Sequence, residues 1–249
     1  MSASPLGLSF GRSAADYERG RPGWPQEVAE IGGLAPASEV LDLGAGTGKL
    51  TRVLAGRFAR VVAVEPDASM RAVFSRATCR PALEGSAEAI PLPDGSVDGV
   101  FCAEAFHWFD WPVALAEIAR VLRPRGVVVL CFNVPRGETR PPLPKQGREI
   151  ARRYRRAGVE PGGSILESGA WREPFADPGS AFEPLREESV DHEHVQDRDG
   201  VVAETLSVSV YASLPAEERR ALGEALRAVL PETVYRTPLR AEVFWTRLR

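Results

Sequence analysis

The stretch Val40-Leu41-Asp42-Leu43-Gly44-Ala45-Gly46-Thr47-Gly48-Lys49-Leu50-Thr51 decides the fold of this chain. Its apolar beginning predicts a strand, its three glycines predict a tight turn, and the residues from Lys49 onward predict a helix. Because glycine has no Cβ, the chain can turn sharply here and bring backbone amides close to a ligand. Glu65 follows Gly44 at a separation of 21 residues, near the roughly 20 at which an acidic side chain meets the ribose hydroxyls of a bound nucleoside. The stretch therefore predicts a nucleoside-binding loop.

Strands and helices alternate on the carboxyl side of this stretch. The ranges 61–64, 97–103 and 127–132 are almost continuously apolar, as strands covered on both faces of a parallel sheet are. Helices are predicted over 49–58, after Asp67 as N-cap, and from Pro112 to Leu122. This alternation predicts an α/β fold with a doubly wound, mostly parallel sheet. The right-handed crossover rule then gathers the loops after residues 43, 65 and 103 along one edge.

The composition argues against several classes of protein. Of the 249 residues 44% are hydrophobic, and the net charge of −3 with a pI near 5.8 argues against nucleic acid or an anionic membrane as the main partner. Three scattered cysteines, Cys79, Cys102 and Cys131, indicate reduced thiols and suggest no metal site. The first residues lack the features of a signal peptide, and no stretch approaches the roughly 18 apolar residues of a membrane span. A cytoplasmic protein is expected.

Five motifs in the same order resemble the class I S-adenosylmethionine-dependent methyltransferases, in particular the small-molecule group that includes trans-aconitate methyltransferase-like (methyltransferase type 11) proteins. Besides the glycine stretch, they are Val64-Glu65-Pro66-Asp67, Gly85-Ser86-Ala87-Glu88-Ala89-Ile90-Pro91, Ala105-Phe106-His107-Trp108-Phe109 and Leu122-Arg123-Pro124-Arg125-Gly126. The leader Tyr17-Glu18-Arg19-Gly20-Arg21-Pro22-Gly23-Trp24-Pro25 also looks like the entry segment of that group. The resemblance covers residues 8–133 well and the C-terminal end weakly.

The resemblance implies a Rossmann-like methyltransferase fold with a seven-stranded sheet. Residues 1–36 would form a leader and a helix that close over the cofactor, and residues 37–133 the α/β core that binds S-adenosylmethionine. Residues 134–190 would be a mainly helical insertion that covers the active-site edge, and residues 191–249 would complete the sheet. Within the last segment, Pro215 to Leu230 has helical periodicity and Ala241 to Leu248 predicts a strand.

The glycine spacing is informative about the ligand. The pattern is GxGxG, and Lys49 stands where the third glycine of GxGxxG would fall, so a dinucleotide and a dehydrogenase are disfavoured. The resemblance implies S-adenosylmethionine as the methyl donor, and S-adenosylhomocysteine as the product. It assigns cofactor binding to Tyr17, Arg21, Asp42, Gly44, Ala45, Gly46, Glu65, Pro66, Met70, Ser86, Ala87, Glu88 and Ala103. Several of these residues also have a plainer interpretation: Asp42 as a brace under the loop, the glycines as an ordinary tight turn, Glu65 as a surface carboxylate, Met70 as core, Ser86 and Glu88 as a solvated turn, and Arg21 as a solvated charge.

His107 is the histidine nearest the predicted functional edge, and it is the candidate catalytic residue. Its titration range suits a general base for a hydroxyl acceptor. Phe106, Trp108 and Phe109 flank it, however, and an aromatic wall that His107 merely shapes is the favoured alternative, since the sequence reveals no carboxylate partner for it.

Three functions are consistent with these motifs. The first is methyl transfer to a small molecule, at the oxygen of a carboxylate or hydroxyl. The second is RNA methylation with the basic segment 145–156, in which Arg148, Arg152 and Arg155 share a helical face. The third is a non-catalytic module that binds S-adenosylmethionine. His192 and His194 alternate as on one strand face, and make only a weak case for a metal. The acceptor and the oligomeric state are left open by the sequence.

Overall fold

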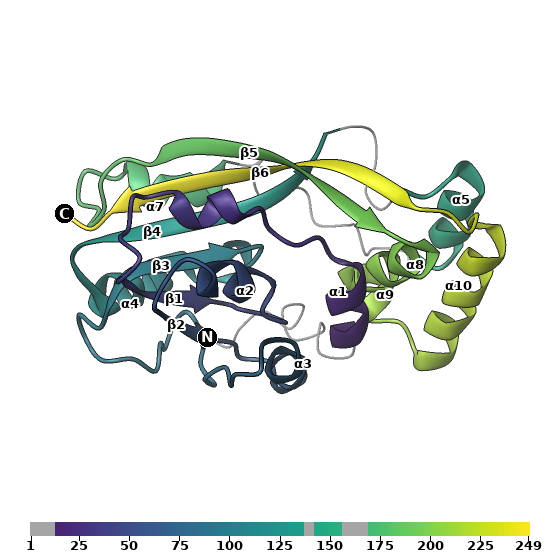
Figure 1. Cartoon of the computed structure of the whole chain (residues 1–249), viewed down its shortest axis with the longest axis horizontal. Helices are drawn as coiled ribbons and strands as arrows, with labels where there is room; N and C mark the ends of the chain where they lie inside the picture. Colours follow the sequence, from purple (N-terminus) through teal and green to yellow (C-terminus); the bar gives the residue numbers. More distant parts are fainter. Residues whose placement is uncertain (1–12, 137–141, 156–168) are drawn as a thin grey trace.

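A single six-stranded sheet organises the computed structural model, which describes residues 13–136, 142–155 and 169–249. The strand order is β2-β1-β3-β4-β6-β5. β1 to β4 pair in parallel, and β6 is antiparallel to both of its neighbours, so only β6 runs against the other five (Figure 1). The predicted α/β fold with a mostly parallel sheet is confirmed. The strands are β1 (Glu39–Leu43), β2 (Arg60–Val64), β3 (Val97–Ala103), β4 (Leu122–Pro135), β5 (Arg186–Gln196) and β6 (Tyr235–Arg247).

The described residues form six strands where seven were expected. Beside β2, Leu83 makes one parallel bridge with Val64, in which its N–H donates to the carbonyl of Ala63 at 2.8 Å. In a parallel ladder the next donor towards the amino terminus would be residue 81, which is a proline and has no N–H. The pairing therefore stops at a single bridge, and β2 is the edge strand.

Helices cover both faces of the sheet. η2 and α2 supply Val28, Leu50 and Leu54 to the core on one face. On the other face, α4, η3, η4 and α7 pack Ile118, Phe106 and further aromatic residues against β3, β4 and β6. These elements, with α3 beside β2, are η2 (Gln26–Glu30), α2 (Lys49–Ala55), α3 (Ala68–Thr78), η3 (Phe106–Trp108), α4 (Trp111–Val121), η4 (Ala170–Arg172) and α7 (Glu173–Ala176).

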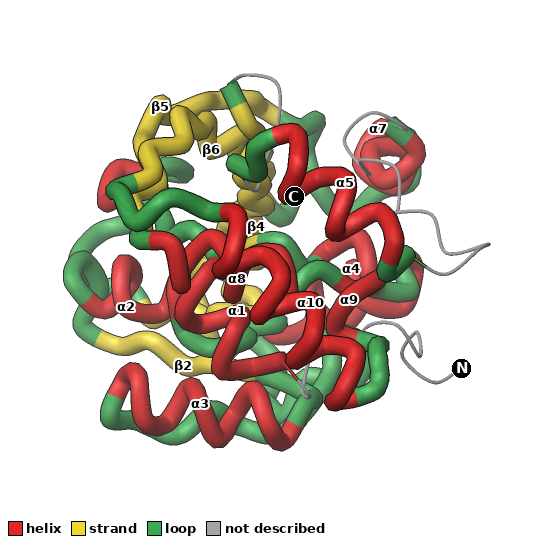
Figure 2. Tube along the Cα trace, turned by 90° about the vertical axis from the view of Figure 1, so that its right-hand side faces the viewer, coloured by secondary structure: helices red, strands yellow, loops and turns green. Residues whose placement is uncertain are grey.

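Four further helices form a separate unit beyond the carboxyl ends of the parallel strands (Figures 1 and 2). This helical cap consists of α5 (Lys145–Arg153), α8 (Arg198–Leu206), α9 (Ser209–Ala212) and α10 (Ala216–Val229), and it has its own core that includes Val202, Leu206 and Leu222. α1 (Ala14–Gly20) lies between the cap and the sheet (Figure 1). Most of the cap comes from residues after 197, and β5 begins at Arg186, so that strand crosses the expected segment boundary at 190.

Among the residues with described positions, no helix combines the length and the apolar character that a membrane span requires.

Candidate functional site

The glycine loop, residues 44–48, joins β1 to α2 and is fastened to β2. The N–H groups of Gly44 and Ala45 both donate to the carbonyl of Val64, at 2.9 and 3.0 Å. Gly44 and Gly46 have φ of +72° and +56°, in the left-handed region that favours glycine. A Cβ on Gly44 would lie 2.7 Å from the Cβ of Ala105, whereas a Cβ on Gly46 would have no atom within 4 Å. The loop is therefore closed at Gly44 and open at Gly46.

Glu65 lies under this loop at the end of β2. One carboxylate oxygen accepts from the N–H of Gly46 and the other from the N–H of Asp67, both at 2.9 Å. Burial raises the pKa of Glu65, and these two hydrogen bonds oppose the rise. A carboxylate has about four acceptor positions, so both oxygens of Glu65 can still accept from hydroxyl groups. The acidic residue thus stands beside the open part of the loop, where the spacing predicts it.

Asp42 acts as a brace inside the fold. It is 1% exposed, and its carboxylate accepts from the hydroxyl of Thr51 on α2 at 2.5 Å. Burial, and to a smaller extent the charge of Glu65, raises the pKa of Asp42 to about 7. This contact supports the bracing interpretation, while a contact of Asp42 with the methionine end of a cofactor stays a prediction.

The leader reaches this site through α1. The ammonium of Lys49 donates to the carbonyl of Glu18 at 2.7 Å, and the Glu18 carboxylate pairs with Arg52 at 2.9 Å. These contacts lay α1 across the start of α2. Sequence reasoning missed both Glu18 and Lys49, since nothing in the sequence signals a pair between a leader and a helix that are so far from each other along the chain.

Tyr17 and Arg21 face the cap as well as the core. The guanidinium of Arg21 lies 5.5 Å from the ring centre of Tyr17, and its Nε donates to the hydroxyl of Ser207, at the end of α8, at 2.8 Å. Met70, which is 4% exposed, packs in a small cluster with Tyr17. The assignment of these three residues to cofactor binding stays a prediction.

The segment 86–92 lies beside the loop after β3. Ala87 is buried, and the carboxylate of Glu88 accepts from the N–H of Asp110 at 3.0 Å, which ties the segment to the start of α4. Ser86 is half-buried and Pro66 is exposed. The structure therefore gives Glu88 a partner in the fold, and its predicted contact with the cofactor is untested.

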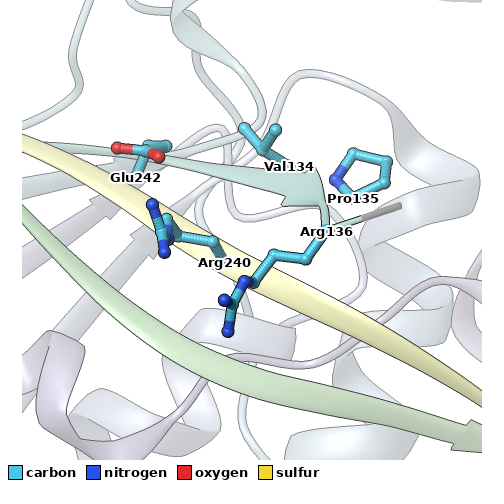
Figure 3. Close-up of a pocket in the computed structure, with 5 residues that line it drawn as sticks. All are labelled: Val134, Pro135, Arg136, Arg240 and Glu242. Atoms are coloured by element: carbon cyan, nitrogen blue, oxygen red, sulfur yellow. The ribbon is translucent and has the colours of Figure 1, made fainter. Parts of the chain in front are cut away.

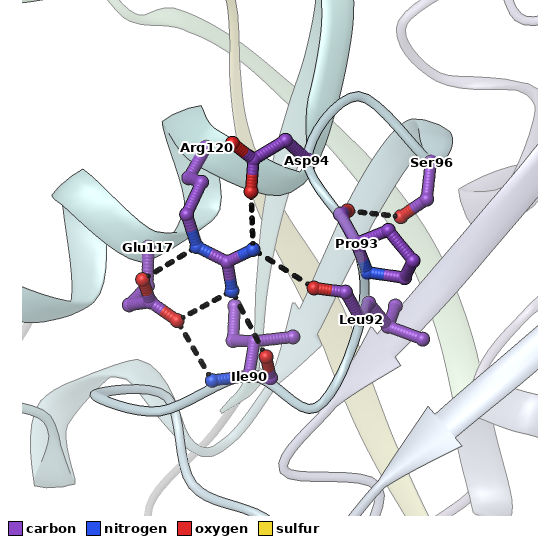
Figure 4. A network of polar contacts seen from close by, with 7 residues as sticks. All are labelled: Ile90, Leu92, Pro93, Asp94, Ser96, Glu117 and Arg120. Carbon is purple, nitrogen blue, oxygen red and sulfur yellow. Dashed lines mark hydrogen bonds and ion pairs between the residues drawn. The ribbon is translucent and has the colours of Figure 1, made fainter.

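Arg120 on α4 fixes the continuation of the same segment (Figure 4). Its guanidinium donates to the carbonyls of Ile90 and Leu92 at 2.9 and 2.8 Å, and it pairs with Glu117 and Asp94. Glu117 in turn accepts from the N–H of Ile90 at 2.9 Å. These ion pairs raise the pKa of Arg120. Arg120 and Glu117 position a predicted cofactor segment, and they were missed because an arginine and a glutamate three residues apart on a helix are an ordinary surface pair.

The loop after β3 carries His107 and a residue that sequence reasoning missed. Among the described residues, the Nδ1 of His107 is buried without a hydrogen-bond partner, and burial lowers the pKa of His107. Glu104 has φ of +51°, and its carboxylate accepts from the N–H of Asn133 on β4 at 2.8 Å. The charge of Glu104 partly offsets the lowered pKa of His107. The structure thus brings a carboxylate near His107, next to the half-buried Ala103.

The basic segment and the two histidines of β5 lie apart from the glycine loop. α5 is part of the cap, with Arg148 donating to the carbonyl of Leu143 at 2.6 Å, and residue 156 falls outside the described ranges. His192 and His194 share a strand face, and contact Asn133 and the carbonyl of Gly20. Where the chain is described, no group of three or more His, Cys, Asp or Glu side chains could hold a metal ion.

Asp42, Gly44, Ala45, Gly46 and Glu65 therefore form one connected cluster. The remaining predicted residues lie on or just after α1, directly after β2, on α3, in the segment between α3 and β3, at the end of β3 and in η3.

Comparison with known proteins identifies the family. A family model described as a methyltransferase domain matches residues 41–130. The chain is 50% identical over 133 residues to an uncharacterized methyltransferase of Mycobacterium tuberculosis, Rv3342, covering 53% of this chain and 55% of that protein. It is 38% identical over 187 residues to a methyltransferase-like protein of Schizosaccharomyces pombe, C25B8.10, covering 72% and 68%. The chain spans about half the length of the mycobacterial relative.

A solved structure agrees with these relatives. It is that of a candidate type II methyltransferase from Anaeromyxobacter dehalogenans, which superposes with a TM-score of 0.55 at 25% identity and covers 92% of this chain and 97% of its own. The glycine loop with Glu65, the mostly parallel sheet and these matches agree with one another. The chain belongs to the class I S-adenosylmethionine-dependent methyltransferases.

Proposed function

We propose that this protein transfers the methyl group of S-adenosylmethionine to an oxygen atom of a small-molecule acceptor. The observation that carries the proposal is the shape of the glycine loop. A Cβ on Gly46 would have no atom within 4 Å. The Glu65 carboxylate accepts from the N–H of Gly46 and has further acceptor positions for a ligand. The buried hydroxyl of Thr47 has no hydrogen-bond partner among the described residues. Open space beside these polar groups fits a nucleoside ligand.

Different residues around the glycine loop would bind different parts of S-adenosylmethionine. Glu65 would accept from the ribose hydroxyls, and the amides of the loop would face the methionine part. Met70 and Ala87 would supply apolar walls. Bound S-adenosylmethionine would supply a methyl group on a positively charged sulfur, so that positioning and exclusion of water account for much of the catalysis.

His107 is proposed to face the acceptor. Its lowered pKa keeps the imidazole neutral near pH 7, and its buried Nδ1 lacks a hydrogen-bond partner in the described part of the chain. A neutral imidazole can take a proton from a hydroxyl acceptor. The aromatic residues around it would form the wall of the site in either case. His107→Ala should lower turnover and leave the affinity for the cofactor unchanged, and full turnover in this variant would refute the base role.

Two considerations favour oxygen and a small acceptor. Malonyl-[acyl-carrier protein] O-methyltransferase of Serratia marcescens is 35% identical to this chain over 135 residues, covering 52% of each, and its name specifies transfer to oxygen. The RNA alternative depends on α5, which lies in the cap beside α10 rather than at the glycine loop (Figure 1).

The proposal is tested first by ligand-induced stabilisation. A ligand that binds only the folded protein raises its apparent stability, by about 2.7 kcal/mol at a hundred times its Kd. S-adenosylmethionine should raise the Tm of the full chain and NAD should not; stabilisation by NAD alone would overturn the proposal. Labelled S-adenosylmethionine and a small-molecule extract then test transfer. Binding with no labelled product would favour the non-catalytic module.

A further inference from the structure

An open pocket lies at the carboxyl end of β4, outside the cofactor cluster. Its volume is about 360 Å³, and it is lined by Val134, Pro135, Arg136, Arg240 and Glu242 (Figure 3). A cavity of this volume lies within the range of about 300–1,000 Å³ that is usual for small-molecule sites. We call it the arginine pocket, since β4 and β6 each contribute one arginine to it.

The arginine pocket is on the same face of the sheet as the aromatic loop that carries His107. Phe106 of that loop packs edge-on against Trp171, with ring centres 6.3 Å apart, and Trp171 contacts Phe132 of β4 at 5.7 Å. Val134 follows Phe132 by two residues, and alternate residues of a strand point to the same face. Glu242 is paired with Phe132 in the β4–β6 register, so it too faces this side. The pocket and the aromatic loop therefore lie on the same face of the sheet.

The two arginines share a single carboxylate. Arg136 Nη1 contacts one oxygen of Asp191 at 2.5 Å, and Arg240 Nε contacts the other at 2.9 Å. These contacts use one side-chain donor of each guanidinium, which has five. Asp191 is thus neutralised, and the remaining donors can face the cavity. The guanidinium groups offer planar, charge-assisted recognition of a carboxylate.

Glu242 adds a negatively charged side chain to the arginine pocket. It lies two residues from Arg240 on β6, about 7 Å along the strand, and its charge helps to raise the pKa of Arg240. The cavity therefore has a cationic part and an anionic part, which suits a molecule that bears a carboxylate together with a hydrogen-bond donor.

We propose that the arginine pocket binds the methyl acceptor, with Arg136 and Arg240 holding a carboxylate and Glu242 accepting from a hydroxyl group of the same molecule. This inference rests on the proposed function. Neighbouring strands are about 4.8 Å apart, and the pocket lies one to two strands from β3. Ala103, at the end of β3, pairs with Cys131, and Val134 and Arg136 follow three and five residues later. At about 3.3 Å per residue, the backbone that carries the two arginines is about 10–17 Å beyond the end of β3, so the held carboxylate is not the group that receives the methyl. The methylated product keeps its negative charge.

The test uses the full-length chain, labelled S-adenosylmethionine and a deproteinised small-molecule extract. Labelled products are separated by charge at neutral pH. The variants are Arg136→Gln, Arg240→Gln and Glu242→Gln. Arg236→Gln is the matched control, because Arg236 is also on β6 and pairs with the β5 carboxylate of Glu193, but does not line the pocket.

We expect the label in anionic products, with transfer lowered about 10- to 100-fold in each arginine variant, as the loss of a hydrogen-bonded charged group implies. KM should rise, the affinity for S-adenosylmethionine in calorimetry should stay unchanged, and Arg236→Gln should match the wild type. Label in neutral or cationic products only, or arginine variants that behave as Arg236→Gln does, would overturn the pocket assignment and leave the proposed function intact. No transfer to any molecule would overturn both.

Discussion

Gly44→Ala adds a methyl group at a position where the backbone conformation disfavours an L-residue and where a neighbouring side chain leaves too little space for a Cβ. The φ of +72° at this position costs an L-residue about 1–2 kcal/mol. The new Cβ would also lie 2.7 Å from the Cβ of Ala105, and overpacking of this kind costs about 1–3 kcal/mol. We expect the free energy of unfolding to fall by about 2–5 kcal/mol.

Gly46→Ala is the matched comparison. Its φ of +56° carries a similar backbone cost, but its Cβ would have no atom within 4 Å, so we expect a loss of only about 1–2 kcal/mol. The added methyl group would instead occupy the open side of the loop, where we propose that the donor binds. This variant should therefore fold and show weakened binding of S-adenosylhomocysteine.

Urea denaturation at fixed temperature measures both losses, and calorimetric titration measures the affinity. Ala105→Gly removes the atom that a Cβ on Gly44 would meet, so the double variant should recover about 1–3 kcal/mol relative to Gly44→Ala, once the effect of Ala105→Gly alone is subtracted. Equal stabilities of Gly44→Ala and Gly46→Ala, or no recovery in the double variant, would refute the steric argument.

Three further outcomes follow from the described contacts. Burial raises the pKa of Asp42 to about 7, so the folded state holds that proton more tightly than the unfolded state. The free energy of unfolding therefore falls by about 4 kcal/mol as pH rises from about 4 to 7. This fall should be absent from urea melts of Asp42→Asn. Glu104→Gln should lower the pKa of His107 further, measured by NMR titration, because the Glu104 charge raises it. Gly20→Ala would place a Cβ 2.0 Å from the backbone nitrogen of Glu204, and should cost roughly 3 kcal/mol or more and expose the α1 amides to hydrogen exchange.

Control variants show whether each effect is specific to the residue that is changed. Glu88→Gln removes a carboxylate that contributes nothing to the pKa of His107, so that pKa should not move. Gly23→Ala adds a Cβ in open space and should leave α1 protected. An unchanged pH dependence of stability in Asp42→Asn would contradict the assignment of the raised pKa to that residue.

The α/β core could be predicted because its signals are local. The apolar runs of β1 to β4, the glycines of the loop and the N-cap at Asp67 each act within a few residues, and Asp67 does accept from the N–H groups of Ser69 and Met70. The seventh strand is not seen among the described residues, where Pro81 stops the pairing beside β2, a consequence of register that a family resemblance does not reveal.

The rest of the site depends on residues far apart in the sequence. Arg136 and Arg240 come together only because β6 returns beside β4, and Arg21 meets Ser207 only because α8 packs on α1. The left-handed backbone at Glu104 leaves no trace in composition or periodicity. Sequence reasoning therefore pointed to the glycine loop, and could not point to the arginine pocket that we propose for the acceptor.

The place of β6 in the sheet has a consequence for biosynthesis. β6 comes last in sequence among the six described strands, yet it lies between β4 and β5. During synthesis, this edge of β4 and the whole of β5 stay unpaired until Tyr235–Arg247 has left the ribosome. Unpaired strand edges are prone to pair with other chains. Formation of the complete sheet is thus expected to be the step at which the nascent chain is most prone to aggregation.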